Sequence, residues 1–151
     1  MAIYDIVVKL KNIILFSVMI SLFTACSTKP VLGLVDDNLK PCPNSPNCVS
    51  SSSSTDKKSY VAPIFYKHTN VNILDEIIVI IDAMPRTTLL TRTNNYLHFE
   101  FRTFLGFVDD VEFYINADNY IHFRSASRLG HYDFNKNYNR YLEIKKKLSK
   151  L

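Results

Sequence analysis

The chain has 151 residues, of which 47% are hydrophobic and 21% charged, and its formal net charge is +4 at pH 7. This length suits one domain and is too short for two of ordinary size. The excess of positive charge is small, whereas a nucleic-acid-binding protein usually gathers a basic face, so the composition argues against a nucleic-acid partner. One dense basic cluster, Lys145 to Lys147 with Lys150, is interpreted as the solvated side of a C-terminal helix, with contact to anionic lipid as the lesser alternative.

The first 26 residues have the pattern of an export signal. Lys9 and Lys11 form a basic start, residues 12–22 (NIILFSVMISL) form a short apolar block, and Ala25 directly precedes Cys26. The apolar block is too short to cross a bilayer core, which takes about 20 apolar residues, and a secretory signal has this arrangement. The end of the segment resembles the lipobox of bacterial lipoproteins, which implies cleavage before Cys26 and lipid on its side chain. The alternative is an uncleaved anchor or a buried helix.

Export divides the chain into three parts. Residues 1–25 are predicted to be a signal peptide of the lipoprotein type, residues 26–40 a tether, and residues 41–151 a single domain. Within that domain, residues 50–58 belong to a serine-rich stretch with almost no apolar content, which predicts a mobile loop.

Lipid on Cys26 leaves two cysteines, Cys42 and Cys48, in the stretch KPCPNSPNC. Disulfides persist in exported proteins, a zinc site takes about four ligands, and the spacing of the pair is not that of a CxxC redox motif. These arguments favour a Cys42–Cys48 disulfide, with free thiols or a metal site as the alternatives.

Two elements precede the main run of strands. Residues 60–66 (YVAPIFY) predict a short strand at a sheet edge, because Pro63 cannot donate to a ladder. In the segment TNVNILDEIIVIIDAMP, Asn70 or Asn72 can cap the start of a helix and Pro85 ends it. Its apolar residues recur at three- and four-residue spacing, which predicts an amphipathic helix packed on a sheet. The predicted inner residues are Val71, Leu74, Ile77, Ile78 and Ile81.

Four segments of alternating apolar and polar residues follow and predict a β-meander. A slip of one residue would exchange the two faces of a strand, so the apolar pattern selects an odd loop length, and a three-residue loop at 117–119 meets this condition. This register places Glu112 opposite Arg124. The segments are 87–93, 96–103, 108–116 and 120–127, and the predicted core pairs are Ile115–Ile121 and Phe113–Phe123.

The last segment, KNYNRYLEIKKKLSKL, predicts a helix with an inner stripe of Tyr138, Tyr141, Leu142, the stem of Lys145, and Leu148. The resulting fold class is α+β, with the order β-α-β-β-β-β-α. A four- to five-stranded antiparallel sheet is expected to carry both helices packed on one face. Its other face is predicted to be polar and aromatic, with His98, Glu100, Arg102, Asp110, Glu112, Tyr114, His122 and Arg124.

Three blocks together resemble the family catalogued as domain of unknown function 1499. They are LKPCPNSPNCVSS (39–51), FLGFVDDVEF (104–113) and RSASRLGHYDF (124–134), the last continuing to Asn137 and Arg140. The resemblance covers nearly the whole chain after the signal and implies no activity, because the family has none assigned. Members are typically small bacterial lipoproteins or plastid proteins. The family pattern after Asp133 runs Leu-Gly-Val-Asn-Arg-x-Arg. Here Asn135 replaces the glycine and can take its left-handed conformation. Tyr138 replaces the first arginine, so an anion held by that pair would bind less well.

Candidate site residues come from the pattern of charges. Asp109 and Asp110 are adjacent in a strand and must point to opposite faces, whereas Asp110 and Glu112 share a face and could flank a water or a metal. Alternatively, Glu112 pairs with Arg124, and the aspartates accept hydrogen bonds from the loop after the last strand. The candidate ligand-binding residues are Asp109, Asp110, Glu112, Arg124, Arg128, Asp133 and Arg140.

The stretch RSASRLGHYD is the richest in functional side chains. An arginine-lined turn near a helix N-terminus can bind phosphate or carboxylate. Alternatively, Arg128 and Asp133 hold the strand-to-helix connection against the cysteine loop. A Ser–His–Asp triad has little support, because the chain has no G-x-S-x-G elbow. No catalytic residue, metal or other cofactor is predicted.

These features predict a lipid-anchored protein of the bacterial envelope that faces the periplasm. It would act as a binding or envelope-associated module, with the bilayer as a partner through Cys26 and a small anionic ligand or an envelope protein as the second partner. Ser27 favours the outer membrane, because an aspartate at that position would indicate inner-membrane retention. The alternative is a hydrolase or metal-assisted enzyme that uses Asp110, Glu112, His122 and His131.

Overall fold

The computed structural model describes residues 32–52, 55–67 and 72–151. The predicted signal peptide, Cys26 and the first part of the predicted tether lie outside these residues, as do Asn70 and Val71. Neither of the described helices is long and apolar enough to cross a membrane.

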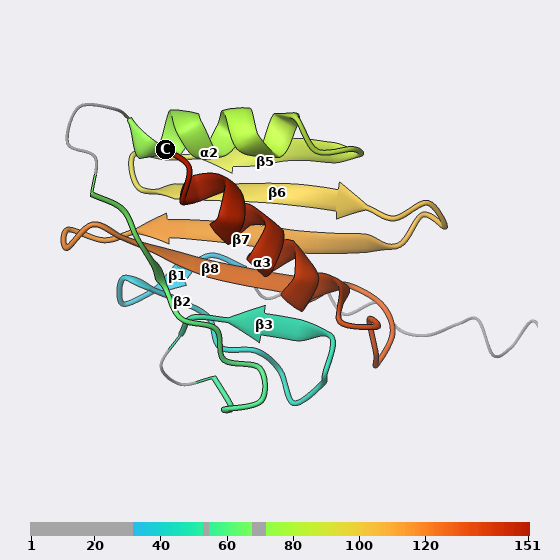
Figure 1. The fold of residues 1–151 in the computed structure, drawn as a ribbon. Helices are drawn as coiled ribbons and strands as arrows, with labels where there is room; N and C mark the ends of the chain where they lie inside the picture. Colours follow the sequence, from blue (N-terminus) through green and yellow to red (C-terminus); the bar gives the residue numbers. More distant parts are fainter. Residues whose placement is uncertain (1–31, 53–54, 68–71) are drawn as a thin grey trace, which may run out of the picture.

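One six-stranded sheet dominates the described part of the chain (Figure 1). Its strands run in the order β3-β8-β7-β6-β5, and β4 pairs with β8 beside β3. All of the strand pairs are antiparallel, with a single parallel bridge between Ser50 and Tyr60. The strands are β3 (Cys48–Ser50), β4 (Ile64–Phe65), β5 (Thr87–Arg92), β6 (Tyr96–Arg102), β7 (Val108–Ile115) and β8 (Tyr120–Ser127).

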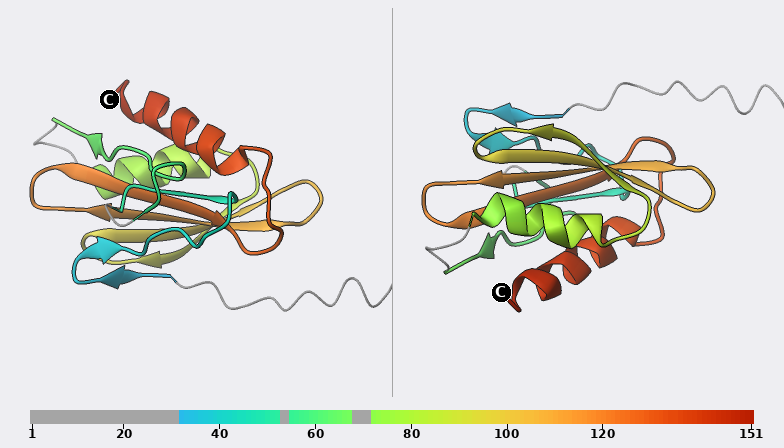
Figure 2. Two further views of the ribbon diagram at one scale, coloured as in Figure 1. Left: turned by 90° about the horizontal axis from the view of Figure 1, so that it is seen from below. Right: turned by 90° about the horizontal axis from the view of Figure 1, so that it is seen from above.

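Two helices, α2 (Ile73–Asp82) and α3 (Lys136–Leu148), lie on one face of this sheet (Figure 2). The predicted α+β class with both helices on one face is therefore confirmed. The sheet has six strands instead of the four or five expected, because β3 joins it, and the hairpin strands β1 and β2 were also not part of the predicted order. Asn72 caps α2, because its side chain accepts a hydrogen bond from the Leu74 amide at 3.1 Å. This was one of the two caps expected from the sequence, and the helix ends before Pro85 as predicted.

The core lies between the helices and the sheet. Phe99, Phe113 and Phe123 stand side by side on β6, β7 and β8, fully buried, with edge-to-face contacts between neighbouring rings. The predicted register is correct: Phe113 lies opposite Phe123, and Glu112 opposite Arg124. Burial of three phenylalanines in adjacent strands contributes roughly 1.5–3 kcal/mol for each side chain, so any slip of register would be costly.

The inner stripe of α3 differs from the prediction. Asn137, Tyr141, Ile144 and Leu148 are buried, whereas the expected inner residues Tyr138 and Leu142 are exposed. The stripe keeps Tyr141 and Leu148 but starts one residue earlier. Periodicity alone places a helix face only to within about one residue when both alternatives carry apolar side chains. Here a buried polar anchor at Asn137, described below, decides the rotation.

The serine-rich stretch also differs from the predicted mobile loop. Ser50 belongs to edge strand β3, a strand that the sequence did not reveal, and Ser51 and Ser52 are buried. The Ser51 hydroxyl accepts a hydrogen bond from the Phe123 amide at 2.9 Å. Ser50 and Ser51 are small enough to pack beside β8, and their hydroxyls satisfy polar groups of the interior, so low apolar content does not prevent residues 50–52 from being buried.

Residues 34–39 form a hairpin instead of the end of a tether. Strands β1 (Leu34–Val35) and β2 (Asn38–Leu39) pair across a two-residue turn in which Asp36 and Asp37 have φ of 49° and 55°. The hairpin covers the sheet face opposite the helices (Figure 2), where Leu39 packs against Tyr96 and Tyr114. The polar face of the sheet is therefore buried in its middle.

Candidate functional site

Three ion pairs occupy the charged positions of β7 and β8, and the first is Glu112–Arg124. Glu112 Oε2 lies 2.8 Å from Arg124 Nη1, and both side chains are buried. Glu112 Oε1 also accepts hydrogen bonds from the Tyr96 hydroxyl and the Gly33 amide, both at 2.7 Å. The pairing expected from the register is confirmed, and it also fastens the start of the hairpin to the sheet.

Asp110 is the centre of the second pair. Arg128 donates to it from Nε at 2.8 Å and from Nη2 at 2.7 Å, and His98 Nε2 lies 2.7 Å from its Oδ1. Arg128 also contacts Glu100 at 2.6 Å. The bidentate arrangement fixes the guanidinium in a plane, so Arg128 holds the chain after β8 against the polar face of the sheet.

The third pair lies on the helix side. Asp109 accepts from Arg140 Nη2 at 2.7 Å and from the Ser127 hydroxyl at 2.6 Å. The Arg140 guanidinium stacks over the Phe101 ring, with its carbon 4.5 Å from the ring centroid. Asp109 and Asp110 therefore point to opposite faces, as adjacent strand residues must. The seven candidate residues are divided between two faces and do not form one site.

A buried asparagine that sequence analysis did not single out for a role joins these elements. Asn137, with no exposed surface, donates from its amide nitrogen to the Asn47 carbonyl, to Ser127 Oγ and to Asp133 Oδ2 at 2.7–3.1 Å. Its oxygen accepts from Ser125 Oγ and Arg140 Nη1. Every polar atom of the amide is used, which is the condition under which a buried polar group stabilises a fold.

Asp133 completes this network at the start of α3. Its carboxylate accepts from the backbone amides of Asn135 at 3.0 Å and Asn137 at 2.8 Å, so it caps the helix in place of Asn135. Asn135 takes the left-handed conformation with φ of 60°. This was predicted because Asn135 replaces a glycine of the family pattern. The helix N-terminus is thus already occupied by a carboxylate of the chain.

The cysteine loop lies against this network. Cys42 and Cys48 form a disulfide, with their Cα atoms 5.6 Å apart, which confirms the favoured alternative. The loop is also held from inside, because the Asn47 carbonyl accepts from Asn137 and from the Ser127 amide. The 42–48 loop, β8 and the start of α3 therefore form one rigid unit.

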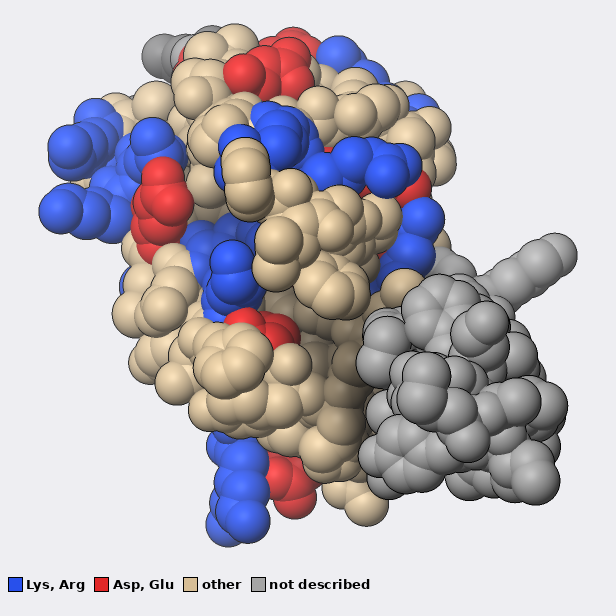
Figure 3. All heavy atoms as spheres, turned by 90° about the vertical axis from the view of Figure 1, so that its right-hand side faces the viewer, with Lys and Arg blue, Asp and Glu red and all other residues tan. Residues whose placement is uncertain are grey.

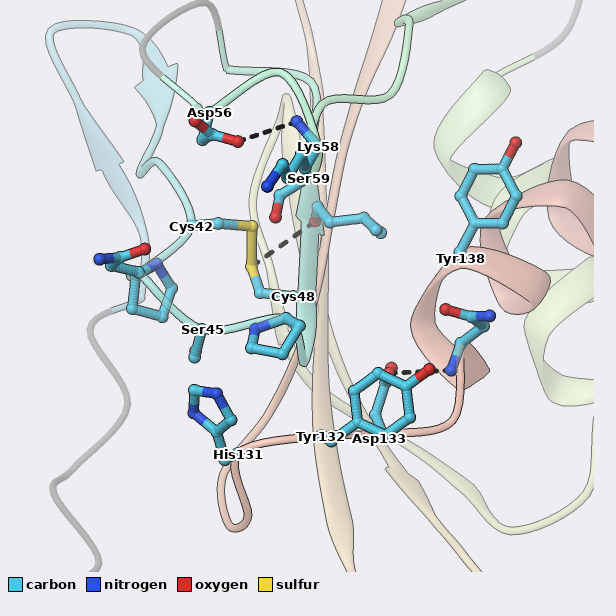
Figure 4. A pocket seen from close by; sticks show the side chains of 15 residues that line it. Cys42, Ser45, Cys48, Asp56, Lys58, Ser59, His131, Tyr132, Asp133 and Tyr138 are labelled. Carbon is cyan, nitrogen blue, oxygen red and sulfur yellow. Dashed lines mark hydrogen bonds between the residues drawn. A yellow bond between two sulfur atoms is a disulfide. The ribbon is translucent and has the colours of Figure 1, made fainter.

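An open groove of about 920 Å³ lies between the disulfide loop and the start of α3. Figure 4 shows the disulfide and Ser45 on one side and Tyr138 on the other, with His131 and Tyr132 at one end. The segment 56–59, with Lys58, closes the opposite end. Of the seven candidate residues only Asp133 lines this groove. Sequence analysis therefore located the disulfide wall of the groove, but most of the charged residues that it selected lie elsewhere.

The residues of the enzyme hypothesis do not converge. Asp110 and Glu112 are buried and fully engaged in ion pairs. His122 lies 3.3 Å from Ser51 Oγ, and burial lowers its pKa, while His131 lies in the groove. Within residues 32–52, 55–67 and 72–151, no group of three or more His, Cys, Asp or Glu side chains is placed to hold a metal ion.

Asp110 is expected to make the free energy of unfolding depend on pH in the acid range. Burial by itself would raise the pKa of Asp110, but hydrogen bonds and charge from Arg128 and His98 hold the pKa below its usual range. Stabilisation from a depressed carboxyl pKa is complete above the unfolded value of about 3.9 and is lost as pH falls through the folded pKa. We therefore expect the free energy of unfolding to fall more steeply in wild type than in Asp110→Asn between about pH 5 and pH 2.

Urea unfolding at a series of pH values measures this difference. Asp118→Asn, in the exposed turn between β7 and β8, is the control and should follow the wild-type profile. Parallel profiles for wild type and Asp110→Asn would contradict the assignment.

Comparison with known proteins agrees with the sequence blocks. Residues 38–148 match the family model described as Protein of unknown function (DUF1499), and the chain belongs to this family. No curated protein and no solved structure matches the chain significantly. The three blocks of the resemblance meet in space through Asn47, Asp109 and Asn137. Within this chain they build the framework that supports the groove.

Proposed function

We propose that this protein is a lipid-anchored, periplasm-facing envelope protein that binds a small anionic ligand in the groove beside the disulfide. The observation that carries the binding role is the rigid construction of the groove. One wall is closed by a disulfide and the other is set by the Asn137 network. A preformed cavity loses little conformational entropy when a ligand binds, and about 920 Å³ is within the range of small-molecule sites.

The groove lining favours a ligand with an anionic group and an apolar part. Lys58 and His131 can contribute a positive charge or hydrogen-bond donors, while Tyr132 and Tyr138 offer rings for stacking. Two carboxylates also line the groove. Asp133 accepts hydrogen bonds from the helix amides that it caps, and Asp56 accepts one from the Lys58 amide at 2.9 Å. The anionic group of a carboxylate or phosphate ester would therefore bind at Lys58 and His131, away from Asp133.

Export is supported by the cysteine chemistry. A disulfide in a surface loop persists in oxidising compartments and is rare in the cytosol, and the apolar block before Cys26 has the length of a signal segment. The resemblance to a lipobox supports attachment of lipid to Cys26, and Ser27 at the following position favours the outer membrane.

A ligand screen by thermal shift, starting with inorganic phosphate and small carboxylates, tests the groove. We expect a compound that stabilises wild type to lose at least about fivefold in affinity with Tyr138→Ala, because the loss of one aromatic contact is worth about 1 kcal/mol or more. Leu142→Ala is the matched control, since Leu142 lies one turn later on α3 with 44% exposure against 45% for Tyr138. If Tyr138→Ala and Leu142→Ala bind the compound with equal affinity, the compound binds outside the groove.

Cell fractionation tests the anchor separately. Cys26→Ser should release the protein from membranes or leave it unprocessed, whereas Ser27→Ala should be processed normally. Normal processing and unchanged membrane association of Cys26→Ser would refute lipidation and leave the groove proposal intact.

A further inference from the structure

The turn between β6 and β7 exposes an apolar tip. Phe104 is 88% exposed and Leu105 78%, and Phe107 is half-exposed. The turn holds itself together without these side chains, because the Thr103 amide donates to the Phe107 carbonyl at 2.8 Å and the Gly106 amide to the Thr103 carbonyl at 3.0 Å. The tip residues therefore add nothing evident to the core, although they belong to the FLGFVDDVEF block.

A second apolar segment leaves the same end of the sheet. The Arg128 amide donates to the Val108 carbonyl at 2.9 Å, which places the start of the β8–α3 connection beside the end of the β6–β7 turn. This connection exposes Leu129 and Phe134, the latter at 78%. Both turns project at the right-hand end of the molecule in Figure 1. Large apolar side chains gathered on one end mark an interaction surface.

Basic side chains border this end. Arg86, Arg102, Lys136 and Arg140 line one hollow together with a single carboxylate, Glu143, and with Thr103, the first residue of the turn. The Arg86 side chain donates to the Arg102 carbonyl at 3.0 Å, and the Arg102 side chain is 55% exposed. Figure 3 views the molecule from this end and shows uncharged side chains in the middle, with Lys and Arg side chains, and some Asp and Glu side chains, around them.

We infer that this end of the sheet docks onto an anionic lipid bilayer, with Phe104 and Leu105 inserted at the headgroup boundary. The surface is a pair of projecting turns, which suits shallow insertion into a soft bilayer. Aromatic and leucine side chains next to Lys and Arg have the composition of interfacial membrane-binding elements. The basic border complements anionic headgroups.

The inference rests on the proposed anchor at Cys26, and the geometry allows both contacts at once. The Gly33 amide donates a hydrogen bond to the Glu112 side chain. Glu112 lies four residues after the start of β7, which is at this end of the sheet, so it is about 13 Å from that end along the strand. The seven residues from Cys26 to Gly33 reach at most about 25 Å. A lipid on Cys26 can therefore lie in the bilayer that the β6–β7 turn touches.

The absence of tryptophan from the chain makes a direct test possible. Phe104→Trp places one reporter at the tip, and Val79→Trp places one on the exposed side of α2, where Val79 is 66% exposed. The full-length variants are reconstituted into vesicles of phosphatidylethanolamine and phosphatidylglycerol, with and without brominated lipid. We expect the Phe104→Trp emission to shift to shorter wavelength and to be quenched by bromine, and the Val79→Trp emission to do neither.

The outcomes separate the inference from the anchor. If the protein floats with the vesicles but the Phe104→Trp emission is not quenched, docking is overturned and the anchor stands. If the protein does not float and its emission is not quenched, both docking and the anchor are overturned. A shift to shorter wavelength without quenching assigns the tip to a protein contact, for example with a second copy of the chain, and also overturns docking. Quenching that is equal in vesicles of neutral phosphatidylcholine refutes the role of the basic border.

Discussion

Arg124→Ala is expected to lower the free energy of unfolding by about 3–5 kcal/mol, because it leaves the Glu112 carboxylate charged and fully buried without its partner. The penalty comes from the stranded charge more than from the attraction of the pair. Arg124 Nε has no hydrogen-bond partner within the described part of the chain, so the pair itself is not ideally satisfied.

A second substitution separates these two contributions. Glu112→Gln should destabilise wild type, because it strands the buried Arg124 guanidinium. In the Arg124→Ala background the same change should be stabilising, since a neutral amide can still accept from the Tyr96 hydroxyl and the Gly33 amide. The sign of its effect therefore reverses between the two backgrounds.

Urea unfolding of the four chains at pH 7 measures this cycle. Arg102→Ala, which removes an exposed arginine paired with Glu100, is the control and should cost less than about 1 kcal/mol. If Glu112→Gln is destabilising in both backgrounds, then the buried charge is not the origin of the loss.

Asn137→Ala is expected to cost about 3 kcal/mol and to lower the melting temperature by about 10 °C. It removes one of the two partners of the buried Asn47 carbonyl, the acceptor of the buried Ser125 hydroxyl, and one of the two donors to Asp133 Oδ2. The loss should also loosen the disulfide loop, so any ligand bound in the groove should bind more weakly.

Asn139→Ala is the matched control for this variant, because Asn139 lies on the same helix and is exposed. It should remain within about 0.5 kcal/mol of wild type. A calorimetric scan in which the two alanine variants melt together would show that the Asn137 network is not important for stability.

Local patterns predicted much of the meander. The alternation in YLHFEF and VDDVEFYI places the phenylalanines on one face, and only one loop length aligns Phe113 with Phe123. The same register brings Glu112 opposite Arg124, so an ion pair of the interior was accessible from sequence. The disulfide was also favoured, since an even pair of cysteines in a chain predicted to be exported has few other uses.

Other features had weaker signals. The Asp36-Asp37 pair between short apolar segments was available as a sign of a two-residue hairpin turn, but two-residue strands carry no periodicity. Edge strand β3 lies in a cysteine and serine stretch that has no apolar alternation. Asn137 looked like an ordinary polar residue of a surface helix, because nothing local shows that Asn47 and Ser125 lie beside it.

The sequence alone determined the alternating strands, the register of β7 and β8 and the capped helix α2, because each depends on neighbours in the chain. It also favoured the pairing of the cysteines, which depends on a simple count. Only the tertiary structure decided the rotation of α3, the burial of the polar face and the position of the groove. These depend on contacts between residues such as Asn47 and Asn137, which are 90 positions apart. No local periodicity encodes such contacts. The buried hydrogen bonds of Asn137 stabilise one rotation of α3 by more than the small difference in apolar burial between two rotations that are one residue apart.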